Sequence, residues 1–249
     1  MRYGICNLSI VALRLESSDS SEMVSQVLYG ETFKVLELRK SWSRIRLAFD
    51  SFEGWIQNLQ YLEIDESRYK EINSKKSILS KDLVDVVQDR SGHLITIVTG
   101  ASLNALDFLG HNFEGAKVQN KQDKPALIET AFNYLNTPHL WGGKTPFGID
   151  ASGLTQMVYR LNGYKLSRKA EDQSLQGTPL SFIEESEPGD LAFFDDNEGR
   201  IIHVGLMMED NYIIHVDGKV RIDRIDHSGI YNVDQRLHSH KLRVIKKII

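Results

Sequence analysis

Asp150 begins the segment that most constrains the fold of this chain, because it reads as the N-cap of an amphipathic helix. Gly163 supplies the stop at the other end. Between them, apolar side chains recur at helical spacing, at Leu154, Met157, Val158 and Leu161. The pattern predicts a helix whose first turn contains position 151.

Position 151 is a place where a helix can activate a nucleophile. Backbone N–H groups in a first turn have no intrahelical partner, and the macrodipole is positive there. A thiol at this point is driven toward the thiolate, and the N–H groups can stabilise the oxyanion that forms on attack at a carbonyl. The residue present is Ala151, which uses none of this. An ordinary aspartate cap followed by a small residue explains the same pattern.

A predicted hairpin over residues 202–216 carries His203 on one strand and His215 on the other. A two-residue loop at 210–211 would place the histidines on opposite faces, whereas a three-residue loop at 209–211 would place them on one face. A general base that is held by a second polar group requires the shared face. Taken singly, each histidine also fits a surface or structural role.

The second half of the chain contains a series of short motifs. In order they are Trp141-Gly142-Gly143, Asp150-Ala151-Ser152-Gly153-Leu154, Leu166-Ser167-Arg168, Asp172-Gln173, Pro-Gly-Asp-Leu-Ala-Phe-Phe at 188–194, His203-Val204-Gly205, and His215. From about Pro125 to its end, the chain resembles the NlpC family of bacterial cell-wall cysteine peptidases, which have a trimmed papain-like fold. The resemblance implies an α+β peptidase domain over residues 122–249.

The resemblance also implies roles for individual residues. Ala151 stands at the nucleophile position, His203 at the general base, and His215 at the residue that orients the base. The residues implied in substrate binding are Trp141, Asp150 and Ser152, together with His139 in place of a family tyrosine whose hydroxyl assists the oxyanion. Ser167 stands where the family has proline.

The missing nucleophile has two explanations. The only cysteine is Cys6, far from the motifs, and it reads as a small buried hydrophobe. Both histidines and the flanking Asp150 and Ser152 are retained, which favours an engineered Cys-to-Ala substitution. The alternative is a natural pseudoenzyme that binds a murein peptide or a protein partner without cutting it.

The N-terminal third has the pattern of a small all-β barrel. Trp42 to Phe49 alternates polar and apolar residues, the period of a half-buried strand. With the Gly30-Glu31 turn and Glu53-Gly54-Trp55-Ile56, residues 1–65 resemble a bacterial SH3-like domain. In a subgroup of the peptidase family such a domain offers an acidic residue to the free amine of the substrate, and Glu53 is the candidate here, with Tyr61 as a second. An exposed turn residue explains Glu53 equally well.

Residues 66–121 are predicted to be a degenerate second SH3-like unit or a structured linker. Two strands are expected, within 80–89 and 93–99, with a turn at 89–92 between them. Asp123 and Pro125 are expected to open a helix that runs to about Leu135.

Composition limits the classes of partner. The net charge of -4 argues against nucleic acid, and no apolar run is long enough to span a membrane. Since no signal peptide is visible, a cytoplasmic protein is expected. The alternative is an exported protein whose leader is missing from this sequence. A monomer is expected.

The resemblance implies cleavage of the γ-D-glutamyl bond to meso-diaminopimelate or L-lysine in murein tri- or tetrapeptides with a free N-terminal L-alanine, in recycling. No metal and no cofactor is implied. A zinc site from His203, His215 and Asp190 is a further alternative, but their spacing matches no recognised ligand pattern.

Overall fold

The computed structural model describes residues 1–196 and 198–249, and its contacts divide the chain into two units. The first contains residues 1–120 and 141–146, and the second contains residues 121–140 and 147–249. The domain boundaries predicted at residues 65 and 121 stay predictions.

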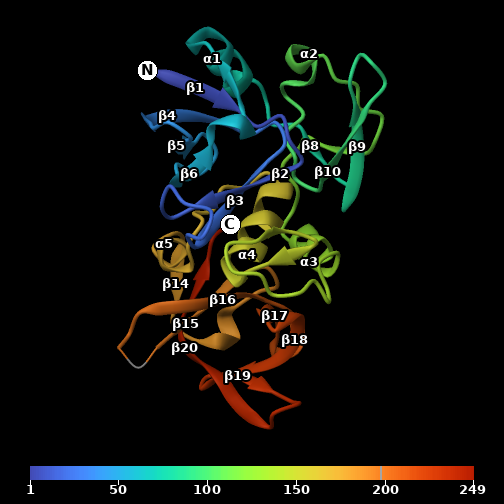
Figure 1. Ribbon diagram of the computed structural model, residues 1–249. Coiled ribbons are helices and arrows are strands. Elements are labelled where there is room, and N and C mark those ends of the chain that lie inside the picture. The colour runs from blue at the N-terminus through green and yellow to red at the C-terminus, as the bar shows by residue number, and fades with distance from the viewer. Residues whose placement is uncertain (197) are drawn as a thin grey trace. The chain divides into compact units, whose positions relative to one another are not determined.

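An antiparallel sheet of seven strands, in the order β3-β2-β6-β5-β4-β1-β7, forms the SH3-like part of the first unit (Figure 1). Alternate side chains of β2 to β6 fill one core, which includes Leu13, Phe33 and Ile45. The predicted strand at Trp42 is present, and its inward and outward residues alternate as expected. The strands are β1 (Arg2–Ile5), β2 (Ile10–Arg14), β3 (Met23–Leu28), β4 (Thr32–Leu38), β5 (Trp42–Leu47), β6 (Glu53–Gln57) and β7 (Leu62–Ile64).

The remainder of the first unit consists of short elements. The predicted hairpin is confirmed, with β9 paired to β10 in antiparallel fashion and the turn at residues 89–92. A side-chain cap from Asp65 to the N–H of Arg68 starts helix α1. The elements are η1 (Asn58–Gln60), α1 (Glu66–Ser74), β8 (Leu79–Ser80), β9 (Val84–Gln88), β10 (Leu94–Val98), α2 (Leu106–Leu109), β11 (Lys117–Val118) and β12 (Lys144–Thr145).

The motif Trp141-Gly142-Gly143 requires glycine at position 142 because the backbone passes close to β3. Gly142 has φ +75°, and a Cβ there would lie 2.3 Å from the carbonyl oxygen of Met23 at the start of β3. Beside it, the N–H of Lys144 donates to Oε1 of Gln26 at 2.7 Å. The motif therefore lets the backbone run close to a strand of the first unit.

The second unit is built on a closed barrel of the strands β20-β15-β16-β17-β18-β19, in which β19 pairs back to β20. Apolar side chains from all six strands, including Phe194, Met207 and Ile225, form the core of the barrel. Strand β14 extends the sheet beside β20. The strands are β13 (Gly148–Ile149), β14 (Thr178–Leu180), β15 (Leu191–Asp195), β16 (Ile201–Met207), β17 (Tyr212–Asp217), β18 (Lys219–Asp226), β19 (Gly229–Asn232) and β20 (Leu237–Lys247).

Helix α4 packs against strands β16 and β17, and helix α3 packs on α4 (Figure 1). The prediction that the α3 helix continues to Leu135 is wrong, because Asn136 adopts φ +66° and its N–H donates to the carbonyl of Val220. In the described part of the chain, no helix is long and apolar enough to cross a membrane. The helices are α3 (Pro125–Phe132), α4 (Ala151–Leu161), α5 (Ala170–Ser174), η2 (Ile183–Glu185) and η3 (Glu209–Asn211).

Candidate active site

Helix α4 begins where the sequence predicts, with Asp150 as its N-cap. The carboxylate accepts the N–H of Gly153 at 2.6 Å and the hydroxyl of Ser152 at 3.1 Å. Ala151 is the first helical residue and is half-buried. Gly163, at φ +83°, follows the end of the helix. The cap and the stop thus fix position 151 at the positive end of a buried helix.

Arg168 holds this helix start through a buried ion pair. Its Nη2 lies 2.6 Å from Oδ2 of Asp150, and its Nη1 donates to Oδ1 of Asp150 and to Oγ of Ser152, both at 2.9 Å. Gln173, which is fully buried, accepts the hydroxyl of Thr155 and donates to the carbonyls of Ser152 and Ser167. The Arg168 and Gln173 motifs therefore serve to fix the first turn of α4.

Replacing Arg168 with methionine is expected to destabilise the protein by about 3–5 kcal/mol, because the buried carboxylate of Asp150 loses its guanidinium partner. In thermal unfolding this corresponds to a fall in Tm of roughly 10 °C for a chain of this size. The matched control is Arg200→Met, which removes an exposed guanidinium 3.1 Å from Asp196 and should cost less than about 1 kcal/mol. Equal small losses in both variants would contradict the role of Arg168. Adding Asp150→Asn to the Arg168→Met protein should recover part of the loss.

The hairpin brings the two predicted histidines onto one face. Met208 N–H donates to the carbonyl of Tyr212 at 2.8 Å, so the loop is the three residues of η3 and the second predicted register is confirmed. Nε2 of His203 lies 3.0 Å from Nδ1 of His215. Gly205 lies on the same strand as His203, and a Cβ there would lie 2.7 Å from Cδ1 of Ile213 and 3.0 Å from the Cβ of His215. The glycine of the His203-Val204-Gly205 motif therefore has a steric reason.

Two residues of strand β18 continue this chain of hydrogen bonds, and neither is predicted from the sequence. Nε2 of His215 lies 3.0 Å from Oδ2 of Asp223, and Nε of Arg221 donates to the same oxygen at 2.5 Å. Burial alone would raise the pKa of Asp223, but the hydrogen bonds from His215 and Arg221 outweigh it and hold this pKa below the ordinary value. The only local signal was the alternation of Arg221 and Asp223, which places both on one face of a strand.

His203 is buried and is neutral near pH 7. Burial lowers its pKa well below 6.5, and the neighbouring rings of His240, His215 and His139 lower it further. His240, on strand β20, stacks on His203 with ring centroids 4.1 Å apart. Burial and the proximity of His215 lower the pKa of His240 as well. A neutral imidazole is the form that can accept a proton, so His203 is suited to act as a general base.

Three histidines are the candidate metal ligands of the described residues. One ring nitrogen each from His203, His215 and His240 lies within 4.8 Å of the other two. His203 and His215 already share a hydrogen bond, however, and His240 lies nearly parallel to His203, at 26°. In-plane lone pairs of stacked rings run side by side and do not meet at one point, so this arrangement favours hydrogen bonding over coordination.

The zinc alternative that included Asp190 does not match this group. Asp190 is fully buried, its Oδ1 lies 2.6 Å from Nζ of Lys124, and its Oδ2 accepts the N–H of Glu187. The carboxylate therefore ties helix α3 to the turn before β15. It is not among the residues grouped with His203 and His215.

The remaining predicted site residues have the following contacts. Glu53 lies between Arg46 and Arg44, at 2.8 and 2.7 Å, and the hydrogen bond from Arg46 is the main cause that lowers its pKa, with that from Arg44 adding to it. The Tyr61 hydroxyl shares a hydrogen bond with Ser43.

Two further predicted site residues come from the peptidase motifs. Trp141 is exposed, and its indole N–H donates to Glu22. His139 is exposed and donates its backbone N–H to the carbonyl of Gly218. Substrate binding by these four stays a prediction.

Comparisons with known proteins agree with this geometry. Residues 136–239 match the NlpC/P60 family, and residues 13–60 match the bacterial dipeptidyl-peptidase Sh3 domain. The chain is similar to Dipeptidyl-peptidase 6 of Lysinibacillus sphaericus, with 27% identity over 240 residues, or 83% of this chain and 85% of that protein. It is 35% identical over 99 residues to Gamma-D-glutamyl-L-lysine dipeptidyl-peptidase of Bacillus subtilis, a match that covers 39% of this chain and 33% of that relative.

Solved structures show the same fold over the whole chain. A NlpC/P60 family protein from Bacillus cereus superposes with a TM-score of 0.81 at 16% identity and 99% coverage of both chains. The predicted fold class, a papain-like domain preceded by an SH3-like barrel, is therefore confirmed. Residues 136–239 are thus an NlpC/P60 domain, of the cysteine-peptidase type, and a bacterial SH3 domain precedes it at residues 13–60.

Proposed function

We propose that this chain has the site of a γ-D-glutamyl–diamino acid peptidase from which only the nucleophile is missing. One observation carries the proposal. His203 and His215 are paired and buried on strands that pack against α4, while the first residue of that capped helix is Ala151. The described residues thus retain a general base, a partner that orients it and a helix N-terminus. As it stands, the chain would bind the substrate without cleaving it.

The chemistry follows from what each part can do. A thiol at position 151 would lose its proton to His203, and the helix N-terminus would stabilise the thiolate. Sulfur would attack the carbonyl of the γ-D-glutamyl bond, and the first-turn N–H groups would stabilise the oxyanion. The amine would leave with the proton from His203, and a water activated by the same ring would hydrolyse the acyl-enzyme. Alanine removes the first step and leaves the paired histidines and the helix N-terminus in place.

Cys6 does not supply the missing thiol. It is buried, and burial raises the pKa of its thiol to about 12, so the thiolate is scarce at neutral pH. The sequence contains no other cysteine. A binding function is therefore the one that the chain with Ala151 supports, whether the alanine is engineered or natural.

The proposed substrate is a murein tri- or tetrapeptide with a free N-terminal L-alanine. The name of the Bacillus subtilis relative specifies a γ-D-glutamyl-L-lysine bond, and meso-diaminopimelate offers the same amine at the same point of the stem. Glu53 is the proposed ligand of the free L-alanine amine. Because its carboxylate contacts Arg44 and Arg46, an incoming ammonium group would have to displace at least one guanidinium. Recycling of released peptides in the cytoplasm also stays a prediction.

Calorimetric titration of the chain with L-Ala-γ-D-Glu-meso-diaminopimelate tests the proposal directly. We expect binding without release of diaminopimelate, because the paired histidines and the capped helix start are present and the nucleophile is not. The L-lysine peptide shows which diamino acid is preferred, and a peptide with an N-acetylated L-alanine should bind more weakly if the free amine is recognised. Absence of binding by both the diaminopimelate and the lysine peptides would reject the proposed substrate class and leave the family assignment untouched.

A further inference from the structure

Asp223 lies at the centre of a fixed set of hydrogen-bond donors. Its Oδ2 is 3.0 Å from Nε2 of His215 and accepts Nε–H of Arg221, and its Oδ1 accepts Nη2–H of Arg221 at 2.9 Å. The side chain of Asp223 is only 2% exposed. An ionised carboxylate can only accept hydrogen bonds, so Nε2 of His215 must carry a proton.

The proton on Nε2 of His215 determines which nitrogen of His203 carries a proton. A neutral His215 protonated on Nε2 has its lone pair on Nδ1, which faces Nε2 of His203 at 3.0 Å. Nε2 of His203 must then donate, and Nδ1 of His203 is left as the basic nitrogen. We infer that Asp223 and Arg221 are positioning residues that set the tautomers of His215 and His203, and so direct the basic nitrogen of His203. The step that this serves rests on the proposed peptidase function, but the tautomers do not.

Arg221 has a role distinct from that of Asp223, because its guanidinium balances the buried negative charge of the Asp223 carboxylate. Without the guanidinium, the carboxylate would favour a second proton on His215. An imidazolium donates from both nitrogens, so His203 would have to accept on Nε2 and carry its own proton on Nδ1. His203 would then have no lone pair to act as a base. The guanidinium of Arg221 therefore offsets the carboxylate charge that faces His215, and Asp223 alone would not be sufficient.

The groups around His215 leave the charge balance at Asp223 dependent on Arg221. His203 and His240 are neutral, so neither opposes the charge of Asp223. Asp217 is held by the amide of Asn232. Among the described residues, the titratable and charged groups of this network are His203 from β16, Asp217 from β17, Arg221 and Asp223 from β18, Asp234 after β19, and His240 from β20. Arg221 is the cation among them.

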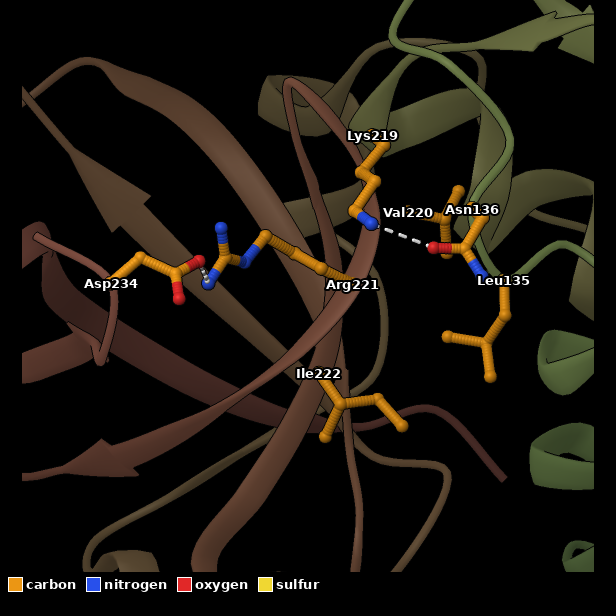
Figure 2. Close-up of a pocket in the computed structure, with 7 residues that line it drawn as sticks. All are labelled: Leu135, Asn136, Lys219, Val220, Arg221, Ile222 and Asp234. Carbon is orange, nitrogen blue, oxygen red and sulfur yellow. Dashed lines mark hydrogen bonds and ion pairs between the residues drawn. The ribbon is translucent and has the colours of Figure 1, made fainter.

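A pocket gives solvent access to Arg221. Figure 2 shows the guanidinium on one wall, paired with Asp234, and Lys219 hydrogen-bonded to Asn136 on the other. The volume is about 270 Å³, and the side chain of Asp234 is 77% exposed. A small cation can therefore reach the place of the Arg221 head group if the side chain is removed. Added guanidinium can therefore be used to restore the missing charge in an Arg221→Ala variant.

The first test is nitrogen NMR of the chain as it exists, with ¹⁵N-labelled histidine. We expect Nε2–H tautomers for both His203 and His215 at neutral pH. Asp223→Asn and Arg221→Ala should each change the protonation pattern of both rings, whereas Arg221→Lys, which retains the charge, should largely preserve it. Matched controls on the same strand are Asp226→Asn, whose carboxylate contacts the exposed His238, and Arg224→Ala, whose guanidinium lies over Tyr212. An Nδ1–H tautomer on His215, or variants that match the controls, would overturn the inference.

The second test uses activity in an Ala151→Cys background. We expect Asp223→Asn to lower kcat by roughly 10²- to 10⁴-fold with little change in KM, because the wrong tautomer is not a base. Arg221→Ala should move the acid limb of the pH–kcat profile to higher pH, and millimolar guanidinium should move it back. A fall in kcat without that pH shift or rescue indicates a merely structural effect and overturns the role of Arg221. If the Ala151→Cys protein has no activity, the proposed function fails, while the NMR result decides the tautomers independently.

Discussion

The Ala151→Cys protein is expected to cleave L-Ala-γ-D-Glu-meso-diaminopimelate at the γ-D-glutamyl bond, with a gain in kcat of roughly 10⁴-fold or more over the chain with Ala151. The reason is that a thiol is the one group that the described site lacks. Asp150 and Arg168 already fix the first turn, and His203 is already neutral and held by His215. Release of diaminopimelate, followed by chromatography, measures the gain.

The same substitution permits a test of the thiol itself. Cys6 is buried and has a pKa of about 12, so labelling by iodoacetamide should be slow in the chain with Ala151. The Ala151→Cys protein should react rapidly, with a pH dependence that places the new thiol below the ordinary cysteine value. Ala151→Ser is the matched control, since a hydroxyl is a much weaker nucleophile. Rapid labelling without cleavage of the diaminopimelate or the lysine peptide would mean that the nucleophile is activated for another substrate.

Replacing His203 with alanine in the Ala151→Cys background is expected to lower kcat by roughly 10²- to 10⁴-fold, the usual contribution of a general base. His215→Ala should lose less, because His215 orients the base without taking the proton of the thiol. Rates across pH 5–9, measured with the same peptide, separate these effects from changes in KM.

His238→Ala is the matched control for the histidine variants. His238 is exposed and contacts Asp226, away from the paired imidazoles of the candidate site. Its loss should leave kcat unchanged. Full activity in the His203→Ala protein would exclude His203 as the base and would direct attention to His240, the ring that stacks on it.

Local features of the fold could be predicted because their causes lie within a few residues. Helix α4 begins and ends as expected, since Asp150 supplies the cap and Gly163 the left-handed stop. The sequence does not decide the register of the hairpin, because loops of two and of three residues are both common in hairpins. The predicted end of α3 is wrong by three residues. A hydrogen bond from the N–H of Asn136 to the carbonyl of Val220 redirects the chain, and nothing in the sequence near Leu135 signals it.

Non-local features could not be predicted in the same way. His203, Asp223 and His240 meet because strands β16, β18 and β20 belong to one closed barrel, and strand order is not encoded in local periodicity. Arg168 was visible as a member of a motif, but its partner Asp150 lies 18 residues earlier and the pairing depends on the fold. The resemblance supplied positions for the nucleophile and the histidines, and the structure supplied the residues that hold them.

Closure of the barrel has a consequence for local unfolding. Strands β16, β17 and β18 have hydrogen-bonded neighbours on both sides, and the pairing of β19 with β20 leaves no free edge in the ring from which to fray. Amide hydrogens in such strands exchange with solvent only when much of the ring opens, whereas the isolated pair β9–β10 can open by itself. Each histidine is paired across one neighbouring strand of this ring, His203 with Phe194 of β15 and His215 with Arg221 of β18. A bound peptide would therefore meet a base held on a paired strand of the ring, and motion for its entry and exit would have to come from the loops.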